Sequence, residues 1–369
     1  MAPITIGAVF PLSGSAGRIG EMKRQGADLA VEHLNAAGGV AGRPLRVVYL
    51  DSKNSTTEGS LAFGRLADVE KTPVVMAAMS QVCLALAPAA DRKQVVLFAN
   101  ASHPELTRKS PFVFRNLPST EQGSTVIAET AYGELGLRRV AVLAVNDEYG
   151  AEAGRVFVDR FTKLGGAIVG QETFELGATD YRAALTKLAQ ARPDGWWIPG
   201  YGAALGVVLK QRDELKLPGQ VLCDLGLVDQ NVISTAGGAT DRVVVVAPAF
   251  DPGDERPAVQ RFVRDFEAKY KESPSFDAAF QYDAVHLIAD AMRRAPTLSG
   301  DGIRTALAAT SGFVGVCGAT SFDPTGQAKM PVVVRLMADG RLLPLDQVQS
   351  TAPTGAATDT TPTDVAGDE

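Results

Sequence analysis

Hydroxyl and aromatic side chains follow three apolar runs of this chain, at positions where strands would end. Ser80 and Gln81 follow the run 74–78 after Met79 and open an amphipathic segment. Unpaired backbone amides at the start of a helix attract an anion. Tyr149 and Tyr201 each precede a glycine after a further run, where a ring offers apolar area and a hydroxyl offers a directed hydrogen bond. These residue types are suited to hold a small anionic ligand, whereas by sequence alone each tyrosine would more often be half-buried packing.

The sequence lacks the common catalytic motifs. Gly14, Gly17 and Gly20 have the spacing GxxGxxG, which differs from the GxGxxG of dinucleotide-binding loops. We find no P-loop, no HExxH, no GxSxG and no catalytic pairing of histidine with cysteine. We therefore expect no enzyme, no cofactor and no metal site. The three cysteines form no CxxC pair, and whether any two of them form a disulfide stays open: Cys83, Cys223 and Cys317.

Composition and charge exclude several other classes of protein. The chain has 369 residues, of which 46% are hydrophobic and 21% charged, so a globular protein with two domains is expected. Its formal net charge of -6 argues against a nucleic-acid partner, because phosphates would require a basic surface. No run of about 18 apolar residues predicts a membrane helix, and no signal peptide is recognised.

Alternating strands and helices must position the candidate binding residues. Apolar residues alternate from Ile4 to Phe10, recur at helical spacing over 27–34, and return in a second strand over 45–50, with Gly38 and Gly39 ending the helix. The same rhythm continues along the chain and predicts an α/β fold with two doubly wound parallel sheets. Further strands are expected at 74–77, 95–99, 140–145, 168–172, 196–198, 221–223 and 243–247.

Several longer stretches of the sequence resemble one protein family. Seven segments carry the resemblance, in this order: PLSG, AVEHLNAAGGVAGRPL, VVYLDSKNSTTEG, FANASHPELT, VNDEYG, PGYGAALG and GATSFDPTGQA. Together they resemble type I periplasmic solute-binding proteins, in particular those that serve branched-chain amino acid ABC importers. The resemblance covers roughly residues 4–345. It implies two doubly wound parallel-sheet lobes, joined by a three-strand hinge, with a ligand bound between them.

The resemblance also implies that both lobes are discontinuous in sequence. Residues 1–118 with 250–325 are expected to form the first lobe, and residues 119–249 with 326–347 the second. Prolines near the three expected crossings interrupt periodic segments, as they do in linkers. Residues 348–369 have no apolar periodicity and are rich in Thr, Ala and Pro, so we expect a flexible C-terminal tail.

Members of this family bind a small carboxylated solute, and their ligand-contacting motifs can be placed on this sequence. Hydroxyl and backbone N–H groups of the first lobe hold the carboxylate, and aromatic residues of the second lobe close over the ligand. The matching positions are Ser80, Gln81, Ala101 and Ser102 for the carboxylate, Tyr149 and Tyr201 for closure, and Tyr282 near the cleft.

Two positions depart from the family pattern. Amino-acid binders of this group place an acidic residue where this sequence has Leu225, with Asp224 one residue earlier. Leucine cannot neutralise a buried ammonium, and an unpaired buried charge costs several kcal/mol. Either Asp224 pairs with the ammonium, or the ligand is an aromatic or 2-oxo acid that has none. Asn100 stands where the family tends to be small, and its amide could reach a further polar group or cap a turn.

The resemblance implies a monomeric binding protein that captures an amino acid or amino-acid-like carboxylate and presents it to an ABC permease in the inner membrane. A ligand-sensing domain of a receptor or regulator would use the same fold, and the sequence does not separate these two roles. We expect a periplasmic or extracytoplasmic location, with a leader on the native precursor that this chain lacks. Near the hinge, the family similarity suggests a structural ion pair for Arg115.

Overall fold

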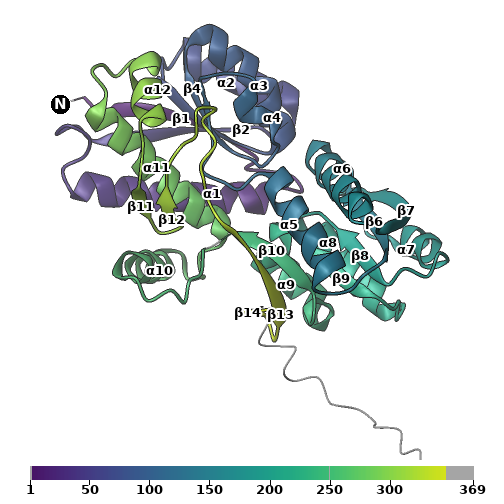
Figure 1. The fold of residues 1–369 in the computed structure, drawn as a ribbon. Coiled ribbons are helices and arrows are strands. Elements are labelled where there is room, and N and C mark those ends of the chain that lie inside the picture. The colour runs from purple at the N-terminus through teal and green to yellow at the C-terminus, as the bar shows by residue number, and fades with distance from the viewer. Residues whose placement is uncertain (1, 249, 346–369) are drawn as a thin grey trace, which may run out of the picture.

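The protein consists of two lobes, each built around its own β-sheet. The computed structural model describes residues 2–248 and 250–345, and Figure 1 shows the two lobes with chain segments passing between them. Two sheets covered by helices confirm the predicted α/β fold. The predicted C-terminal tail, residues 348–369, lies outside the described residues.

Five parallel strands form the sheet of the first lobe. They are arranged in the order β2-β1-β3-β4-β5, so the strands of the opening βαβ unit are neighbours. β1 pairs with β2 from Ile4 opposite Leu45 to Phe10 opposite Asp51, as the apolar pattern predicts. The strands are β1 (Ile4–Phe10), β2 (Leu45–Asp51), β3 (Val74–Ala78), β4 (Val96–Asn100) and β5 (Val113–Phe114).

Helices cover both faces of this first sheet. α1 and α11 pack on one face, with α12 beside α11 and α10 against α1, whereas α2 and α3 pack on the other (Figure 1). A short hairpin follows α12. The elements are α1 (Gly17–Ala36), α2 (Thr56–Asp68), α3 (Ser80–Lys93), α4 (Glu105–Arg108), α10 (Pro257–Tyr270), α11 (Phe276–Arg294), α12 (Gly300–Ala308), β11 (Phe313–Gly315) and β12 (Gly318–Thr320).

The second lobe contains a seven-stranded sheet in the order β14-β13-β10-β9-β8-β6-β7. Five of these strands are parallel, but β13 and β14 run antiparallel at one edge, which the prediction of a parallel sheet did not include. The strands are β6 (Arg139–Val145), β7 (Ala167–Phe174), β8 (Gly195–Ile198), β9 (Gln220–Cys223), β10 (Val244–Pro248), β13 (Val332–Ala338) and β14 (Arg341–Pro344). The helices are α5 (Thr120–Gly133), α6 (Glu148–Lys163), α7 (Arg182–Ala189), α8 (Gly202–Glu214), α9 (Gln230–Ala236) and the 3-10 turns η1 (Leu225–Val228) and η2 (Gly237–Thr240).

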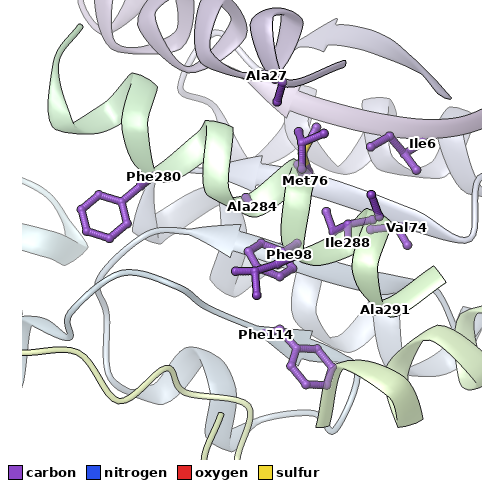
Figure 2. Close-up of a cluster of buried hydrophobic side chains, with 14 of the residues drawn as sticks. Ile6, Ala27, Val74, Met76, Phe98, Phe114, Phe280, Ala284, Ile288 and Ala291 are labelled. Carbon is purple, nitrogen blue, oxygen red and sulfur yellow. The ribbon is translucent and has the colours of Figure 1, made fainter. Parts of the chain in front are cut away.

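A continuous apolar cluster holds α1 and α11 against the first sheet. β3 and β4 are buried throughout, as central strands of a parallel sheet are. Met76 and Phe98 of these strands belong to one buried cluster with Ala27 of α1 and with Ala284 and Ile288 of α11 (Figure 2). Fully burying a Met, Ile or Phe side chain contributes about 1.5–3 kcal/mol. The cluster therefore fixes two helices whose first turns reach the cleft described below.

The chain passes between the lobes three times. It leaves the first lobe after β5, returns after β10, and leaves again between β12 and β13. Beside β5, Arg115 forms a parallel bridge with Gln327, so the first and third passages lie next to each other. The exact residues at which the two lobes divide stay a prediction.

The three cysteines are buried and free, so no two of them form a disulfide. Burial raises the pKa of Cys83 to about 12 and raises the pKa values of Cys223 and Cys317 as well. These thiols act as small packing groups. Within residues 2–248 and 250–345, no helix is long and apolar enough to cross a membrane.

Candidate ligand-binding site

A cleft of about 80 Å³ lies between the lobes. The first lobe lines it with residues at or after the ends of β3 and β4, with the first two turns of α1 and with the first turn of α11. The second lobe lines it with residues after β6, β8 and β9. Ligands of α/β proteins bind at such carboxyl ends of strands. A larger hollow of about 1050 Å³ over α6 and β7 contains none of the predicted site residues. Eight of these residues line the cleft: Ser80, Gln81, Asn100, Ala101, Ser102, Tyr149, Tyr201 and Leu225.

The start of α3 forms the part of the first-lobe wall that suits an anion. Ser80 and Gln81 are the first residues of this helix, so their backbone N–H groups have no acceptor within it. Met79, just before them, has φ 71° and ψ 128°, which non-glycine residues rarely adopt. Such strain costs about 1–3 kcal/mol and is typical of binding sites. The Gln81 side chain is engaged elsewhere, because its Nε2 donates to the carbonyl oxygen of Asn54 at 2.7 Å.

Ser102 connects the cleft to the first passage between the lobes. Its Oγ accepts a hydrogen bond from Thr120 Oγ1 at 2.7 Å, and its carbonyl oxygen accepts one from Thr120 N at 2.8 Å. Because the Ser102 oxygen serves as an acceptor, the hydroxyl proton is available for a ligand carboxylate. Thr120 is the first residue of α5 in the second lobe. The hydrogen bond between Ser102 and Thr120 therefore links a ligand at Ser102 to the first passage between the lobes.

Arg115 holds the Ala101–His103 segment from behind. Its buried guanidinium donates to the carbonyl oxygens of His103 at 2.6 Å and Ala101 at 3.3 Å, and to Gln327 Oε1 at 2.6 Å. Burial lowers the pKa of Arg115 to about 9. All of these partners are neutral, so the expected ion pair is wrong for the part of the chain that the structure describes. Arg115 positions the binding segment through hydrogen bonds.

Lys23 and Asp277 line the cleft beside Asn100, although the sequence analysis did not identify them. Lys23 is only 3% exposed, and its ammonium donates to Asp277 Oδ1 and to Asn100 Oδ1. The Lys23–Asp277 ion pair therefore contributes no net charge to the cleft. Lys23 lies in α1 and Asp277 in α11, 254 residues apart, and neither a motif nor a spacing connects them in the sequence.

The second-lobe wall carries two tyrosines whose hydroxyls already bond to carboxylates of the same lobe. Tyr149 donates to Asp224 Oδ2, and Tyr201 donates to Asp147 Oδ2. Their ring centroids lie 5.9 Å apart. Burial, followed by the neighbouring carboxylates, raises the pKa values of both hydroxyls well above the usual range. Both therefore stay protonated and contribute ring surface to the cleft.

The structure does not bring Asp224 to the cleft. This residue lines a smaller adjoining cavity of about 20 Å³, which shares Ser102, Tyr149 and Leu225 with the cleft. Its carboxylate accepts hydrogen bonds from the Tyr149 hydroxyl and, at 3.1 Å, from Gly226 N. Burial raises the pKa of Asp224 to about 7, although these hydrogen bonds act in the opposite direction. Leu225 does line the cleft, so an apolar side chain stands where the family has its acid.

Two other carboxylates line the second-lobe wall, Asp147 and Asp229. They cap α6 and α9 by accepting hydrogen bonds from Gly150 N at 2.8 Å and Asn231 N at 2.7 Å. Burial raises the pKa values of both carboxyl groups. An aspartate before a helix is a common N-cap, so its capping role could be read from the sequence, whereas its position at the cleft could not. Lys23 pairs with Asp277, so the ionised forms of Asp147 and Asp229 would give the cleft excess negative charge, whereas burial favours their neutral forms and the charge of Arg18 favours ionised Asp229.

Apolar side chains bridge the two lobes across the cleft. Ile19 and Met79 of the first lobe pack against the buried cluster of the second, and Leu225 and Val228 of the second lobe pack against that of the first. Leu117 and Phe276 add apolar surface from the first lobe. The cleft therefore suits a ligand that has an apolar portion as well as charged groups.

Tyr282 lies away from the cleft, which corrects its predicted position. Its ring packs against Phe262, with the centroids 4.7 Å apart, and its hydroxyl lies 2.8 Å from His33 Nδ1. Phe276 and Asp277 line the cleft from the first turn of α11. Because a helix turns by about 100° per residue, Tyr282 is rotated by roughly 140° from Asp277. The motif placed Tyr282 on the correct helix but on the wrong face.

Comparison with known proteins shows to which family the chain belongs. Residues 3–341 match the family model described as periplasmic binding protein. The chain belongs to this family. Its members are solute-binding proteins and not enzymes, which agrees with the two-lobed fold and with the polar cleft between the lobes. Among the described residues, no cluster of three or more His, Cys, Asp or Glu side chains could hold a metal ion.

Relatives of this periplasmic binding protein cover most of its length. A leucine-, isoleucine-, valine-, threonine-, and alanine-binding protein of Pseudomonas aeruginosa is 24% identical over 88% of this chain and 87% of its own. The substrate binding protein LivJ from Streptococcus pneumoniae, solved with isoleucine, is similar with a TM-score of 0.85 and 28% identity, over 92% of this chain and 97% of LivJ. An R. palustris solute binding protein solved with benzoate has a TM-score of 0.85 at 23% identity, over 93% and 95% of the two chains, and shows the shared fold.

Proposed function

We propose that this protein is the extracytoplasmic solute-binding component of an ABC importer and captures an amino acid or amino-acid-like carboxylate by closing its lobes. The main observation in support of this proposal is the difference between the two walls of the cleft. The first-lobe wall offers hydroxyls and a helix start, and the second-lobe wall carries excess carboxylates. A zwitterion is complementary to both walls. The names of the Pseudomonas protein and of LivJ support the same ligand class.

The ligand's carboxylate would lie at the start of α3. The hydroxyls of Ser80 and Ser102 and the free backbone N–H groups of the helix are the donors available there. Hydrogen bonds to a charged group contribute about 1.5–3 kcal/mol each, and the positive end of the helix dipole favours an anion. This placement makes the first lobe the one that holds the carboxylate.

The ligand's ammonium would face Asp147 and Asp229. Both carboxylates line the cleft, and burial raises the pKa of each, so a bound cation would favour their ionised forms. Leu225 could not serve this purpose, and Asp224 is separated from the cleft by its contact with Tyr149. The missing family acid is thus replaced by two carboxylates at other positions of the same lobe.

An aromatic or 2-oxo acid without an ammonium is the second candidate ligand. Leu225 favours it, because this apolar side chain stands where the amino-acid binders carry their acid. Ile19, Leu117 and Phe276 enlarge the apolar surface, and the R. palustris protein solved with benzoate has the same fold. The excess of carboxylates argues against such an anion, since no ammonium would balance its charge.

Calorimetric titration of the purified protein with matched acids separates the two candidates. Leucine and phenylalanine would be compared with 4-methyl-2-oxopentanoate and 4-hydroxybenzoate. We expect an amino acid to bind at least tenfold more tightly than the acid that lacks the ammonium. A thermal-shift screen would first find the ligand, because a ligand at 100 times its Kd stabilises the protein by about 2.7 kcal/mol. Tighter binding of an acid without an ammonium would contradict the amino-acid proposal.

In the cell, the closed form would dock on a permease in the inner membrane. Such a protein works as a monomer in the periplasm or on the outer face of the membrane, because each lobe must be free to move about the hinge. The three passages between the lobes allow this motion. Copurification with a permease, in place of a receptor or regulator, would support the importer role over a sensor.

A further inference from the structure

Asn100 carries a buried amide nitrogen that has no hydrogen-bond partner among the described residues. The side chain is 3% exposed and lines the cleft at the end of β4. Its Nδ2 makes no hydrogen bond, although the atom is inaccessible to solvent. Leaving such a donor unsatisfied costs about 1–3 kcal/mol. Native proteins rarely retain an unpaired buried donor without a reason, and a missing ligand is one such reason.

The orientation of this amide is fixed by its neighbour. The Lys23 ammonium can only donate, so the atom of Asn100 that faces it must be the oxygen, Oδ1. Lys23 is itself held by Asp277 Oδ1, which comes from a different helix. Turning the amide around would place two donors against each other. The Nδ2 group therefore cannot satisfy itself by exchanging places with the oxygen.

We infer that Asn100 recognises a second oxygen of the ligand, separate from its carboxylate and uncharged, such as a hydroxyl, keto or carboxamide oxygen. The inference rests on the proposed function, because it assumes a small ligand in this cleft. In the proposed function, Ser80, Ser102 and the start of α3, which line the cleft, serve the carboxylate. A second carboxylate would meet the excess negative charge of Asp147 and Asp229, whereas a neutral oxygen would accept from Nδ2 without that repulsion.

Pairs of ligands of similar shape, in which one member carries an additional neutral oxygen, test this inference; in asparagine an amide NH2 accompanies that oxygen. Valine would be compared with threonine, leucine with asparagine, and benzoate with 4-hydroxybenzoate, each by calorimetric titration of the parent protein. A site built around a polar donor rejects the analogue that lacks the acceptor. We expect at least a tenfold preference for the oxygenated member of a pair. Equal binding, or tighter binding of the member without the oxygen, would overturn the inference even if every variant failed to fold.

Asn100→Leu keeps the number of side-chain heavy atoms but removes the Nδ2 donor, together with the Oδ1 acceptor of Lys23. It should reduce the tenfold preference to less than threefold. Asn116→Leu is the matched control. Asn116 is equally buried, donates to the carbonyl oxygen of Phe280 at 2.8 Å, and lies outside the cleft lining. This control should keep the preference of the parent. If Asn100→Leu weakens the binding of both members of a pair equally, Asn100 contacts the carboxylate that they share. If the parent binds aspartate more tightly than asparagine, the ligand atom that Asn100 contacts is charged. Either result overturns the inference.

The outcomes also separate this inference from the proposed function. If amino acids fail to bind but 4-hydroxybenzoate binds more tightly than benzoate, the ligand class is wrong and the role of Asn100 stands. If amino acids bind without any preference for the second oxygen, the ligand class stands and the role of Asn100 is wrong. Absence of binding by every compound would overturn both.

Discussion

The two walls of the cleft use their polar groups in different ways. On the first-lobe wall, the Ser102 hydroxyl proton, the Asn100 amide and the N–H groups at the start of α3 are donors without an acceptor among residues 2–248 and 250–345. On the second-lobe wall, the hydroxyls of Tyr149 and Tyr201 are already bonded to carboxylates. The first wall is thus prepared for an anion, and the second wall is an internally bonded surface with excess negative charge.

This difference assigns a separate task to each lobe. In the proposed function, the serine hydroxyls and the N–H groups at the start of α3 would bind the ligand carboxylate, whereas the tyrosine rings and the capping carboxylates would form a surface that closes over it. A ligand that touches both walls only in the closed state must favour that state. Ser102, through Thr120, joins the first wall directly to the hinge. Substitutions in one wall at a time test whether the two walls have these separate roles.

Removing the hydroxyls of the first wall should have the largest effect. In the double variant Ser80→Ala with Ser102→Ala, two hydrogen bonds to a charged group are lost, each worth about 1.5–3 kcal/mol. Calorimetry should show binding weakened by at least about a hundredfold. Ser110→Ala is the control, because Ser110 is buried, donates to Asp91 Oδ1 at 3.1 Å and lies outside the cleft lining. Parent-like affinity in the double variant would show that the carboxylate lies elsewhere.

Neutralising the second wall should have the next largest effect. Asp147→Asn and Asp229→Asn remove a charge but keep the helix caps, since asparagine caps a helix about as well as aspartate. Each should weaken amino-acid binding by about tenfold or more, because losing the charged partner of a buried ammonium costs roughly 2 kcal/mol or more. Asp224→Asn is the matched control and should change affinity little. A larger loss in Asp224→Asn than in the other two variants would restore Asp224 as the partner of the ammonium.

The last expected effect concerns stability at different pH values and not ligand affinity. Burial raises the pKa of Asp224 from its ordinary value of 3.8 to about 7, so the folded protein binds a proton there that the unfolded chain has released. Its contribution to stability is fully present below about pH 4 and is lost as the pH rises toward 7, by at most about 1.4 kcal/mol per pH unit.

Urea unfolding of the parent and of Asp224→Asn between pH 4 and 8 measures this contribution. The difference in unfolding free energy, parent minus variant, should fall as the pH rises and level off above 7. The comparison with the variant removes the contributions of other buried carboxyl groups, such as Asp283, whose pKa burial raises to about 6. A difference that stays constant or rises with pH would show that Asp224 is ionised in the folded protein throughout this range.

Much of the first wall could be predicted from the sequence, because its groups follow strands. Ser80 follows β3 after one residue, and Asn100 and Ser102 come at or after the end of β4. These neighbouring parallel strands end at the same edge of the sheet. A motif that locates a strand end therefore also locates the residue in space. The same reasoning brought Tyr149 and Tyr201 to the cleft from β6 and β8.

The residues that were missed or misplaced depend on helix rotation and on contacts between distant segments. Lys23 looks like an ordinary polar residue of α1, and only the packing of α1 against α11 buries it beside Asp277. Tyr282 is on the expected helix but faces His33 and Phe262. Asp224 lies one residue from the family position, and that single step turns it from the cleft into the adjoining cavity. Side-chain direction, which sequence similarity does not encode, decides all three cases.

Small-angle scattering with and without ligand tests most directly whether one wall binds the ligand and the other closes over it. The parent protein, at a ligand concentration that calorimetry shows to be saturating, should have a smaller radius of gyration than the free protein. The double variant Ser80→Ala with Ser102→Ala should keep the radius of gyration of the free protein at the same ligand concentration. An unchanged radius of gyration in the saturated parent would contradict the account, because the ligand would then bind without bringing the two walls together.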